Sequence, residues 1–454
     1  MQRYLLTDGR LFPSFMKFAL PVLGSLFLQM IYGATDLVIV GRYADSTSVS
    51  AVATGSQVML TITSIITGFT MGETILIGQL MGARRERECA GAVGSGIVFF
   101  VILALVLTAI MVPFAGNFAA LMHAPPEAFA QTTSYIAICS MGFVFITGYN
   151  VVSAIMRGLG NSALPLLFVA IAATANIFGD LLLVAVFHMA ATGVAISTVM
   201  SQGVSLLLAI VILKHRGLPF KFYRSDIRFD ARSTFTMLRL GFPIALQDMM
   251  VGISFLIILM ILNSMGLVAS AAVGAVDKIL GFGLLVPSAF SSAIATFVAQ
   301  NMGAGKELRA RHAMYYGMSG SLVFSLFFFF ASQFAGETLV GFISRDALVI
   351  AAGAAYLKAY SWDCILVCFV FSMTGFFTGC GKTSFVMVQS LIGTFLVRIP
   401  FSAFMSRRPG VTMFQIGLAA PTASIVQILL CAVYLLSGKW RISSTERGSY
   451  GHSL

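Results

Sequence analysis

Long apolar stretches separated by short polar connections cover almost the whole chain of 454 residues. A helix needs about 20 apolar residues to cross the hydrocarbon core of a bilayer. The pattern therefore predicts an all-α integral membrane protein with twelve transmembrane helices. Their expected spans are 13–40, 50–77, 91–113, 131–153, 163–186, 190–213, 235–262, 271–298, 313–336, 350–374, 384–406 and 412–437.

The apolar pattern repeats along the chain at a constant offset of 221 residues. The segment 79–83 recurs as 300–304, and Glu86 recurs as Glu307. Such a register indicates two tandem copies of one six-span unit, the usual layout of a secondary transporter. We expect two pseudo-symmetric six-helix bundles. Their predicted bounds are an N-terminal lobe at 1–213, a cytoplasmic linker at 214–234, and a C-terminal lobe at 235–454 that ends in a short cytoplasmic tail.

Composition and charge narrow the class further. Charged residues make up only 10% of the chain, against about 25% in a soluble domain, so a water-soluble protein is excluded. The net charge of +11 does not indicate nucleic-acid binding, because the basic residues are spread over short loops. Of 28 Lys and Arg residues, 21 lie on the side that holds both predicted termini. The positive-inside rule therefore predicts a multi-pass protein of the cytoplasmic membrane with both termini in the cytoplasm.

Signals of enzymatic or cofactor chemistry are weak. Residues 379–383 resemble the end of a phosphate-binding loop, but Phe376 stands where that motif needs glycine. The six cysteines are scattered and have no neighbouring ligands for a structural metal site. The N-terminus shows no cleavable signal peptide. We expect no enzyme activity, no cofactor and no nucleic-acid partner.

Carboxylates inside the predicted spans are the clearest functional candidates, because a charge in the bilayer core is costly and usually functional. Asp36 and Asp180 are predicted in the outer half of the first repeat. Asn176 shares a helix face with Asp180, and Thr198 lies at a similar depth. The four residues either hydrogen-bond neighbouring helices or form an ion site. Two close carboxylates cannot both ionise easily, which favours H⁺, whereas the oxygen ligands also suit Na⁺.

Other polar residues are candidates for a substrate cavity. Gln29 and Tyr32 form a polar stripe with Asp36 on the first span. In the second repeat, Asp248 lies near mid-membrane, where it would attract a cationic substrate. The remaining in-span acids are Asp277, Asp363 and, near an inner end, Glu73. Asp363 either pairs with Arg398 or Lys358, or serves a substrate or an ion.

These features together resemble the multidrug and toxic compound extrusion (MATE) family over about residues 10–440. The resemblance is carried by Pro21 with Asp36 fifteen residues later, by the repeated segment 79–83, and by Asn176-x-x-x-Asp180 followed by 193–198. It also rests on Met156-Arg157-Gly158-Leu159-Gly160-Asn161.

The resemblance implies a twelve-helix, V-shaped antiporter, acting as a monomer. It would export cationic or amphipathic compounds in exchange for H⁺ or Na⁺, with the ion at Asp36, Asn176, Asp180 and Thr198 and a helix bend at Pro21. One branch of the family carries a glutamate eight residues after the proline that matches Pro243. Here that position is Val251. The same branch carries an aspartate in the tenth span, and Asp363 lies about one turn before that position. The resemblance therefore favours the bacterial branch that relies on the first lobe.

Two rival functions remain from the sequence. A lipid-linked precursor flippase of the same superfamily would need a basic cavity for an anionic headgroup, whereas the in-span charges here are mostly acidic. A channel would need a filter-like motif, which we do not find in the sequence. Multidrug efflux by antiport is the favoured function.

Overall fold

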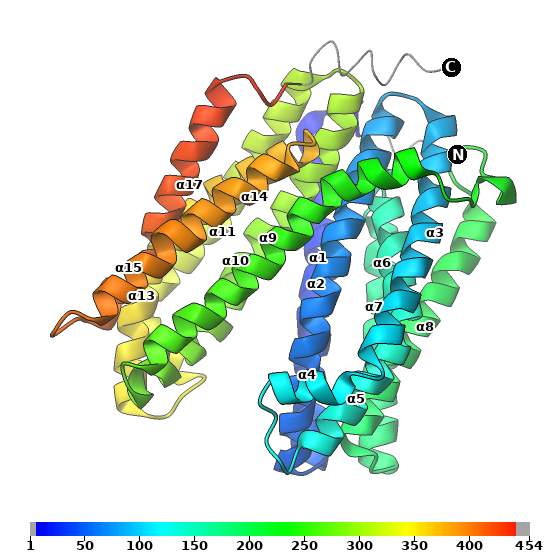
Figure 1. Cartoon of the computed structure of the whole chain (residues 1–454). Helices are drawn as coiled ribbons and strands as arrows, with labels where there is room; N and C mark the ends of the chain where they lie inside the picture. The colour runs from blue at the N-terminus through cyan, green and yellow to red at the C-terminus, as the bar shows by residue number, and fades with distance from the viewer. Residues whose placement is uncertain (1–5, 442–454) are drawn as a thin grey trace. The chain divides into compact units, whose positions relative to one another are not determined.

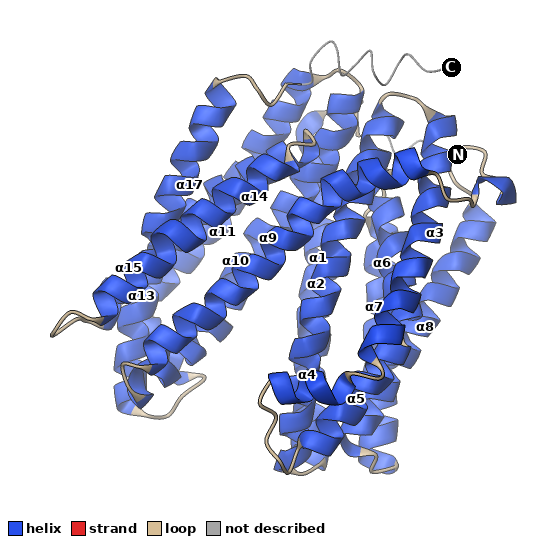
Figure 2. Ribbon diagram, viewed as in Figure 1, coloured by secondary structure: helices blue, strands red, loops and turns tan. Residues whose placement is uncertain are grey.

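The computed structural model describes residues 6–441, and within that range the chain forms helices and no β-strand (Figure 2). Eleven helices are long and apolar enough to cross a membrane, and one bent helix pair makes a twelfth crossing when counted as one span. The predicted all-α membrane fold is therefore confirmed. Residues 1–5 and 442–454, which include the predicted cytoplasmic ends, lie outside the described residues.

The helices follow the predicted apolar stretches in chain order (Figure 1). In the first repeat they are α1 Leu11–Tyr43, α2 Ser46–Gly82, α3 Glu86–Met111, α4 Ala115–Leu121, α5 Phe129–Met141, α6 Phe143–Gly158, α7 Ala163–Asp180, η1 Leu181–Val186 and α8 Ala190–Arg216. A short turn, η2 Arg224–Asp226, lies in the linker. The second repeat has α9 Ala231–Asn263, α10 Leu267–Gly303, α11 Glu307–Phe334, α12 Gly336–Gly341, α13 Ala347–Gly379, α14 Thr383–Leu391, η3 Ile392–Arg398, α15 Ile399–Ser406, α16 Met413–Gly417 and α17 Ala419–Leu436.

The repeat seen in the sequence sets the helix boundaries. Helix α2 spans 46–82 and α10 spans 267–303, so both ends are displaced by the same 221 residues. The starts of α3 and α11, at Glu86 and Glu307, keep that offset. Both repeats also contain a π-helical segment, η1 and η3, in their fifth span. Such segments are rare and frequently occur at functional sites.

One predicted span is bent in the structure. The stretch 131–153 forms α5 and α6, which meet at Gly142 at an angle of 51°, whereas its counterpart α13 is one continuous helix. A Cβ atom on Gly142 would lie 2.5 Å from Val199 Cγ2 of α8. Glycine at the bend therefore lets α8 pack closer to this backbone than any larger residue would allow.

The chain divides into two compact units, which differ from the predicted lobes. Among the described residues, unit 1 contains 20–245 and unit 2 contains 6–19 and 246–441. Residues of the predicted linker, 214–234, and the first part of α9 therefore belong to unit 1, and the start of α1 belongs to unit 2. The reason is close packing: Cβ atoms on Gly68 and Gly72 of α2 would lie about 2.5 Å from backbone atoms of α9. Pro21 and Pro243 each lie inside a helix, within two residues of the point where it changes unit.

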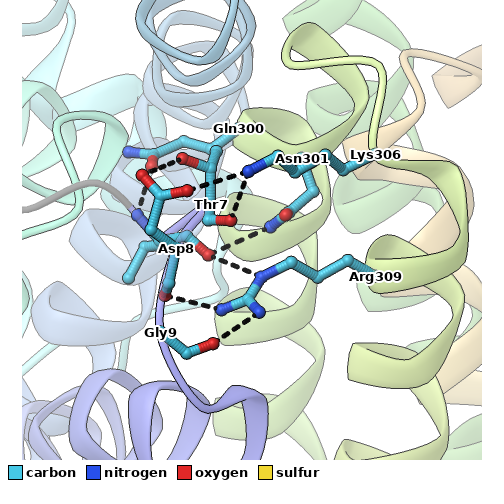
Figure 3. Close-up of polar contacts among 8 residues, drawn as sticks. Thr7, Asp8, Gly9, Gln300, Asn301, Lys306 and Arg309 are labelled. Atoms are coloured by element: carbon cyan, nitrogen blue, oxygen red, sulfur yellow. Dashed lines mark hydrogen bonds and ion pairs between the residues drawn. The ribbon is translucent and has the colours of Figure 1, made fainter.

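The segment before α1 is bound within unit 2 (Figure 3). Arg309 of α11 donates to the carbonyl oxygens of Asp8 and Gly9, each at 2.8 Å. Lys306 donates to the carbonyl oxygen of Thr7 at 2.9 Å and pairs with the Asp8 carboxylate at 2.8 Å. Gln300, the first residue of the repeated segment 300–304, accepts from the amide of Leu6 at 2.9 Å. We call residues 6–9 the N-terminal strap.

The segment before α9 is bound in a corresponding way within unit 1. Arg87 of α3 pairs with Asp226 at 2.7 Å. Ser95 accepts from the amide of Asp230 at 3.0 Å, and its hydroxyl lies 2.7 Å from that of Thr234. A Cβ atom on Gly94 would lie 1.9 Å from the carbonyl oxygen of Asp226, so α3 needs glycine at that position. We call residues 223–230 the linker strap.

Candidate functional site

Two buried carboxyl groups face each other inside unit 1. Asp36 of α1 is 6% exposed and Asp180, the last residue of α7, is fully buried. The two groups lie within hydrogen-bonding reach of each other. Asp36 Oδ1 and both oxygens of Asp180 are buried and have no hydrogen-bond partner within the described residues. Two facing acceptors without a donor repel unless a positive charge separates them, by about 4 kcal/mol at 4 Å in an effective dielectric of 20.

Asn176 lies one turn before Asp180 on the same face of α7, and it is fully buried. Its side chain also reaches Asp36. The Asn176 amide group donates weakly to Ser197 Oγ at 3.4 Å, and its carbonyl oxygen Oδ1 has no partner. The structure therefore brings together three of the four predicted ion-site residues from α1 and α7.

Thr198 of α8, the fourth predicted residue, has a buried hydroxyl without a hydrogen-bond partner in the described part of the chain. Its neighbour Ser197 makes the direct contact with α7, because the Ser197 hydroxyl donates to the backbone oxygen of Asn176 at 2.9 Å. A Cβ atom on Gly179 would lie 2.4 Å from Ser197 Oγ, so glycine allows this close approach of α8. The sequence analysis missed Ser197. The small residues at 179 and 197 could have indicated it.

The unpartnered oxygens fit a hard cation. They are Asp36 Oδ1, Asn176 Oδ1, Asp180 Oδ1, Asp180 Oδ2 and Thr198 Oγ1. Carboxylate, amide and hydroxyl oxygens are the ligands that Na⁺ prefers, and the carboxylate pair equally provides a place for a proton. Clusters of three or more His, Cys, Asp or Glu side chains, which a tightly bound metal would need, do not occur between residues 6 and 441.

The predicted polar stripe of α1 lies along this site. Tyr32, half-buried, interacts with Asp36 and with Gln202, one turn after Thr198 on α8. Gln29 is exposed and reaches Tyr149 of α6. The stripe therefore extends the polar surface from the carboxylate pair along α1. Gln202 and Tyr149 are further members that the sequence analysis did not identify, because nothing in the spacing relates α6 or α8 to α1.

The acids of unit 2 are arranged differently. Asp248 of α9 and Asp277 of α10 are exposed, and Asp363 of α13 is 4% exposed. The Asp363 carboxylate accepts a hydrogen bond from Ser424 of α17. Within residues 6–441, neither of the two offered ion-pair partners, Arg398 and Lys358, lies within ion-pair distance of Asp363. Arg398 lies over the ring of Phe255, 4.5 Å from the centroid, and donates to the Tyr360 hydroxyl at 3.3 Å. The charges of Asp363 and Arg398 still attract each other at longer range.

Two successive segments of the chain match one family model. The model is described as MatE, and the matched residues are 21–182 and 243–404. The chain belongs to the MATE family. The two matches correspond to the two repeats, and the first contains Asp36 and Asp180.

Relatives and solved structures agree with the family. The chain is 27% identical to the "Probable multidrug resistance protein YpnP" of Bacillus subtilis, over 97% of this chain and 98% of that protein. It is 21% identical to the "Multidrug export protein MepA" of Staphylococcus aureus, over 98% of each. A crystal structure of a MATE protein in complex with MaD3S superposes with a TM-score of 0.90 at 18% identity, over 97% of this chain and 99% of that one. As a member of the MATE family, the chain is a membrane transporter and not an enzyme.

Proposed function

We propose that this protein exports cationic or amphipathic small molecules across the cytoplasmic membrane in exchange for H⁺ or Na⁺. The ion binds at Asp36, Asn176, Asp180 and Thr198. The observation that carries the proposal is the set of buried, unpartnered oxygens around the Asp36 and Asp180 carboxylates. Relatives named as multidrug resistance or export proteins support the substrate class.

The coupling step is a change in the charge of the carboxylate pair. An ion that enters from outside relieves the repulsion between Asp36 and Asp180, and α1 rearranges near Pro21, which releases the substrate outward. Gln29 and Tyr32 line the substrate route, with the exposed acids Asp248 and Asp277 and the buried Asp363 as further cation-attracting positions. One charge moving down 100 mV supplies about 2.3 kcal/mol. The transporter acts as a monomer with both termini in the cytoplasm.

Reconstitution tests this proposal. The protein in vesicles should export a fluorescent lipophilic cation under an imposed pH or Na⁺ gradient, and the gradient that drives export identifies the ion. The variants Asp36→Asn and Asp180→Asn should lose this export, whereas Asp346→Asn, which removes a surface carboxylate at the start of α13, should keep it. Normal export in the double variant Asp36→Asn/Asp180→Asn would refute the ion site. Movement of a lipid-linked anionic precursor without cation export would favour a flippase.

A further inference from the structure

One packing contact occurs in both repeats with different chemistry. In unit 1, a Cβ atom on Gly96 of α3 would lie 2.2 Å from Glu73 Oε1 of α2. In unit 2, a Cβ atom on Gly317 of α11 would lie 2.4 Å from Ile294 Cδ1 of α10. Residues 73 and 294, and likewise 96 and 317, are related by the 221-residue offset. Since isoleucine fills the same position in unit 2, packing of the two helices does not require a carboxylate.

The Glu73 carboxyl group has no partner that would stabilise a charge. The side chain is 1% exposed, and both of its oxygens are buried without a hydrogen-bond partner within residues 6–441. The hydroxyl of the adjacent Thr74 donates elsewhere, to the backbone oxygens of Thr70 and Ala154. A carboxylate buried without a cation or donors is very costly, whereas the neutral acid is far less so.

Among residues 6–441, no positive charge acts on the Glu73 carboxyl group. From α3, the ionisable neighbour is the buried Cys89 thiol, with Glu86 beyond it. From α9, the backbone at Met237 and Gly241 packs against Gly72. From α6, Ala154 and Gly158 pack against Thr74, and the side chain of Arg157 between them interacts with Tyr149. Glu73 therefore faces apolar groups, backbone and one thiol.

We propose that Glu73 is a second proton-binding carboxylate of unit 1, which holds a proton in this conformation and releases it during transport. On release the O–H bond breaks heterolytically, water takes the proton, and a carboxylate remains. Because Glu73 is 1% exposed, release requires an opening of unit 1 during transport; the nearer end of α2 is Gly82, nine residues along the helix and cytoplasmic in the proposed orientation. That this release is a step of transport rests on the proposed function. That Glu73 holds a proton in this conformation does not.

Glu73 is a site separate from the Asp36 and Asp180 pair. Gly55 of α2 packs against Tyr135, which interacts with Asp36. Glu73 lies 18 residues further along the same helix, about 27 Å at 1.5 Å per residue. No direct proton transfer spans that length, so the two sites load and unload independently, from opposite ends of unit 1.

Infrared spectroscopy of the reconstituted protein tests the proton directly. We expect a C=O stretching band of a buried carboxylic acid at neutral pH that disappears in Glu73→Gln and persists in Asp36→Asn. The matched control Glu88→Gln, which removes an exposed carboxylate of α3, should leave the band unchanged. A spectrum in which Glu73→Gln removes only a carboxylate band would overturn the proposal, because Glu73 would then be ionised.

Transport assays test whether release of the proton matters. Glu73→Ile copies Ile294 of unit 2 and should fold at least as stably as the wild type, measured by thermal unfolding. We expect it, like Glu73→Gln, to reduce gradient-driven export at least tenfold and to abolish its dependence on internal pH. Wild-type export with wild-type pH dependence in both variants would overturn the role in transport.

The outcomes separate this inference from the proposed function. Loss of export in the Glu73 variants with normal export in Asp36→Asn would support Glu73 and refute the pair as the coupling site. If neither the wild type nor any variant shows gradient-driven export, the antiport proposal fails and the infrared band alone tests Glu73. The presence of the band would support a proton on Glu73, and its absence would refute this inference as well.

Discussion

Units 1 and 2 share a helix order and a register but differ in how they satisfy their buried polar groups. Unit 1 buries Asp36 Oδ1 and both carboxyl oxygens of Asp180 and of Glu73 without a hydrogen bond from any described residue. In unit 2, Asp363 is bound by Ser424, and Ile294 replaces Glu73. The glycine of the Gly96 and Gly317 contacts is kept in both units, because an added Cβ atom would clash there, while the residue that packs on it differs. Buried carboxyl oxygens without partners distinguish the unit proposed to bind ions.

The largest expected difference between the units is the effect on export of replacing a buried aspartate. Asp180→Asn should reduce export to the level of protein-free vesicles, because the amide removes the charge that an ion must neutralise. Asp363→Asn should change export by less than about tenfold, or 1.4 kcal/mol. Initial rates of dye export under the driving gradient measure both. Equal losses in the two variants would show that the units share the coupling role.

Ser197 provides a second, smaller test within unit 1. Its hydroxyl positions Asn176 by donating to that residue's backbone, so Ser197→Ala should weaken ion binding about 10- to 100-fold. The concentration of coupling ion that gives half-maximal export should rise, with little change in the maximal rate. Ser319→Ala, which removes an exposed hydroxyl that donates within α11 to the backbone of Tyr315, is the control. A lower maximal rate at unchanged ion affinity would contradict a positioning role.

Ser424 tests the arrangement of unit 2, in which the buried carboxylate has a hydrogen-bond donor. Ser424→Ala leaves the buried Asp363 carboxylate without its donor and should cost about 1–3 kcal/mol of stability. Thermal unfolding in detergent should show a lower midpoint, while Ser424→Thr, which keeps the hydroxyl, should restore it. An unchanged midpoint for Ser424→Ala would mean that Asp363 finds another partner.

The two straps should differ in strength. Arg309→Ala removes three hydrogen bonds to the N-terminal strap and should destabilise unit 2 by about 1–3 kcal/mol. Arg87→Ala removes one ion pair of the linker strap, with an arginine that is 69% exposed, and should cost less than about 1 kcal/mol. Proteolysis rates and unfolding midpoints compare them. A larger effect for Arg87→Ala would reverse this order.

The smallest expected effect concerns pH and the start of α9. The Ser233 side chain and amide lower the pKa of Asp230, which caps this helix. Its contribution to stability is therefore present above the unfolded pKa of about 3.9 and is lost as pH falls through the lower folded pKa. Because Asp230 is half-buried at the start of a helix and remains partly screened by solvent, the contribution is about 0.3 kcal/mol. Asp230→Asn should flatten the acid limb of a stability curve by that amount, and Glu88→Gln should not.

The family and the span pattern were predictable from the sequence because they depend on local and repeated features. Apolar length marks each crossing, and the fixed offset between the repeats survives in the helix boundaries to the residue. Asp36, Asn176 and Asp180 could be grouped because helical depth and in-span charge are both readable along one chain. The bend at Gly142 could not be predicted from the sequence, because it depends on packing against Val199 from another helix.

Tertiary structure decided which of the in-span acids have partners. Asp363 and Arg398 lie at similar depth in their predicted spans, which suggested an ion pair. Depth along a helix does not say in which direction a side chain points around the helix axis, and in the structure Asp363 accepts from Ser424. Ser197 rather than Thr198 contacts Asn176 for the same reason. The unit boundaries inside α1 and α9 were equally hidden, because a continuous apolar helix carries no mark of the neighbour against which each half packs. Sequence sets the order and depth of residues, and packing sets their rotation and partners.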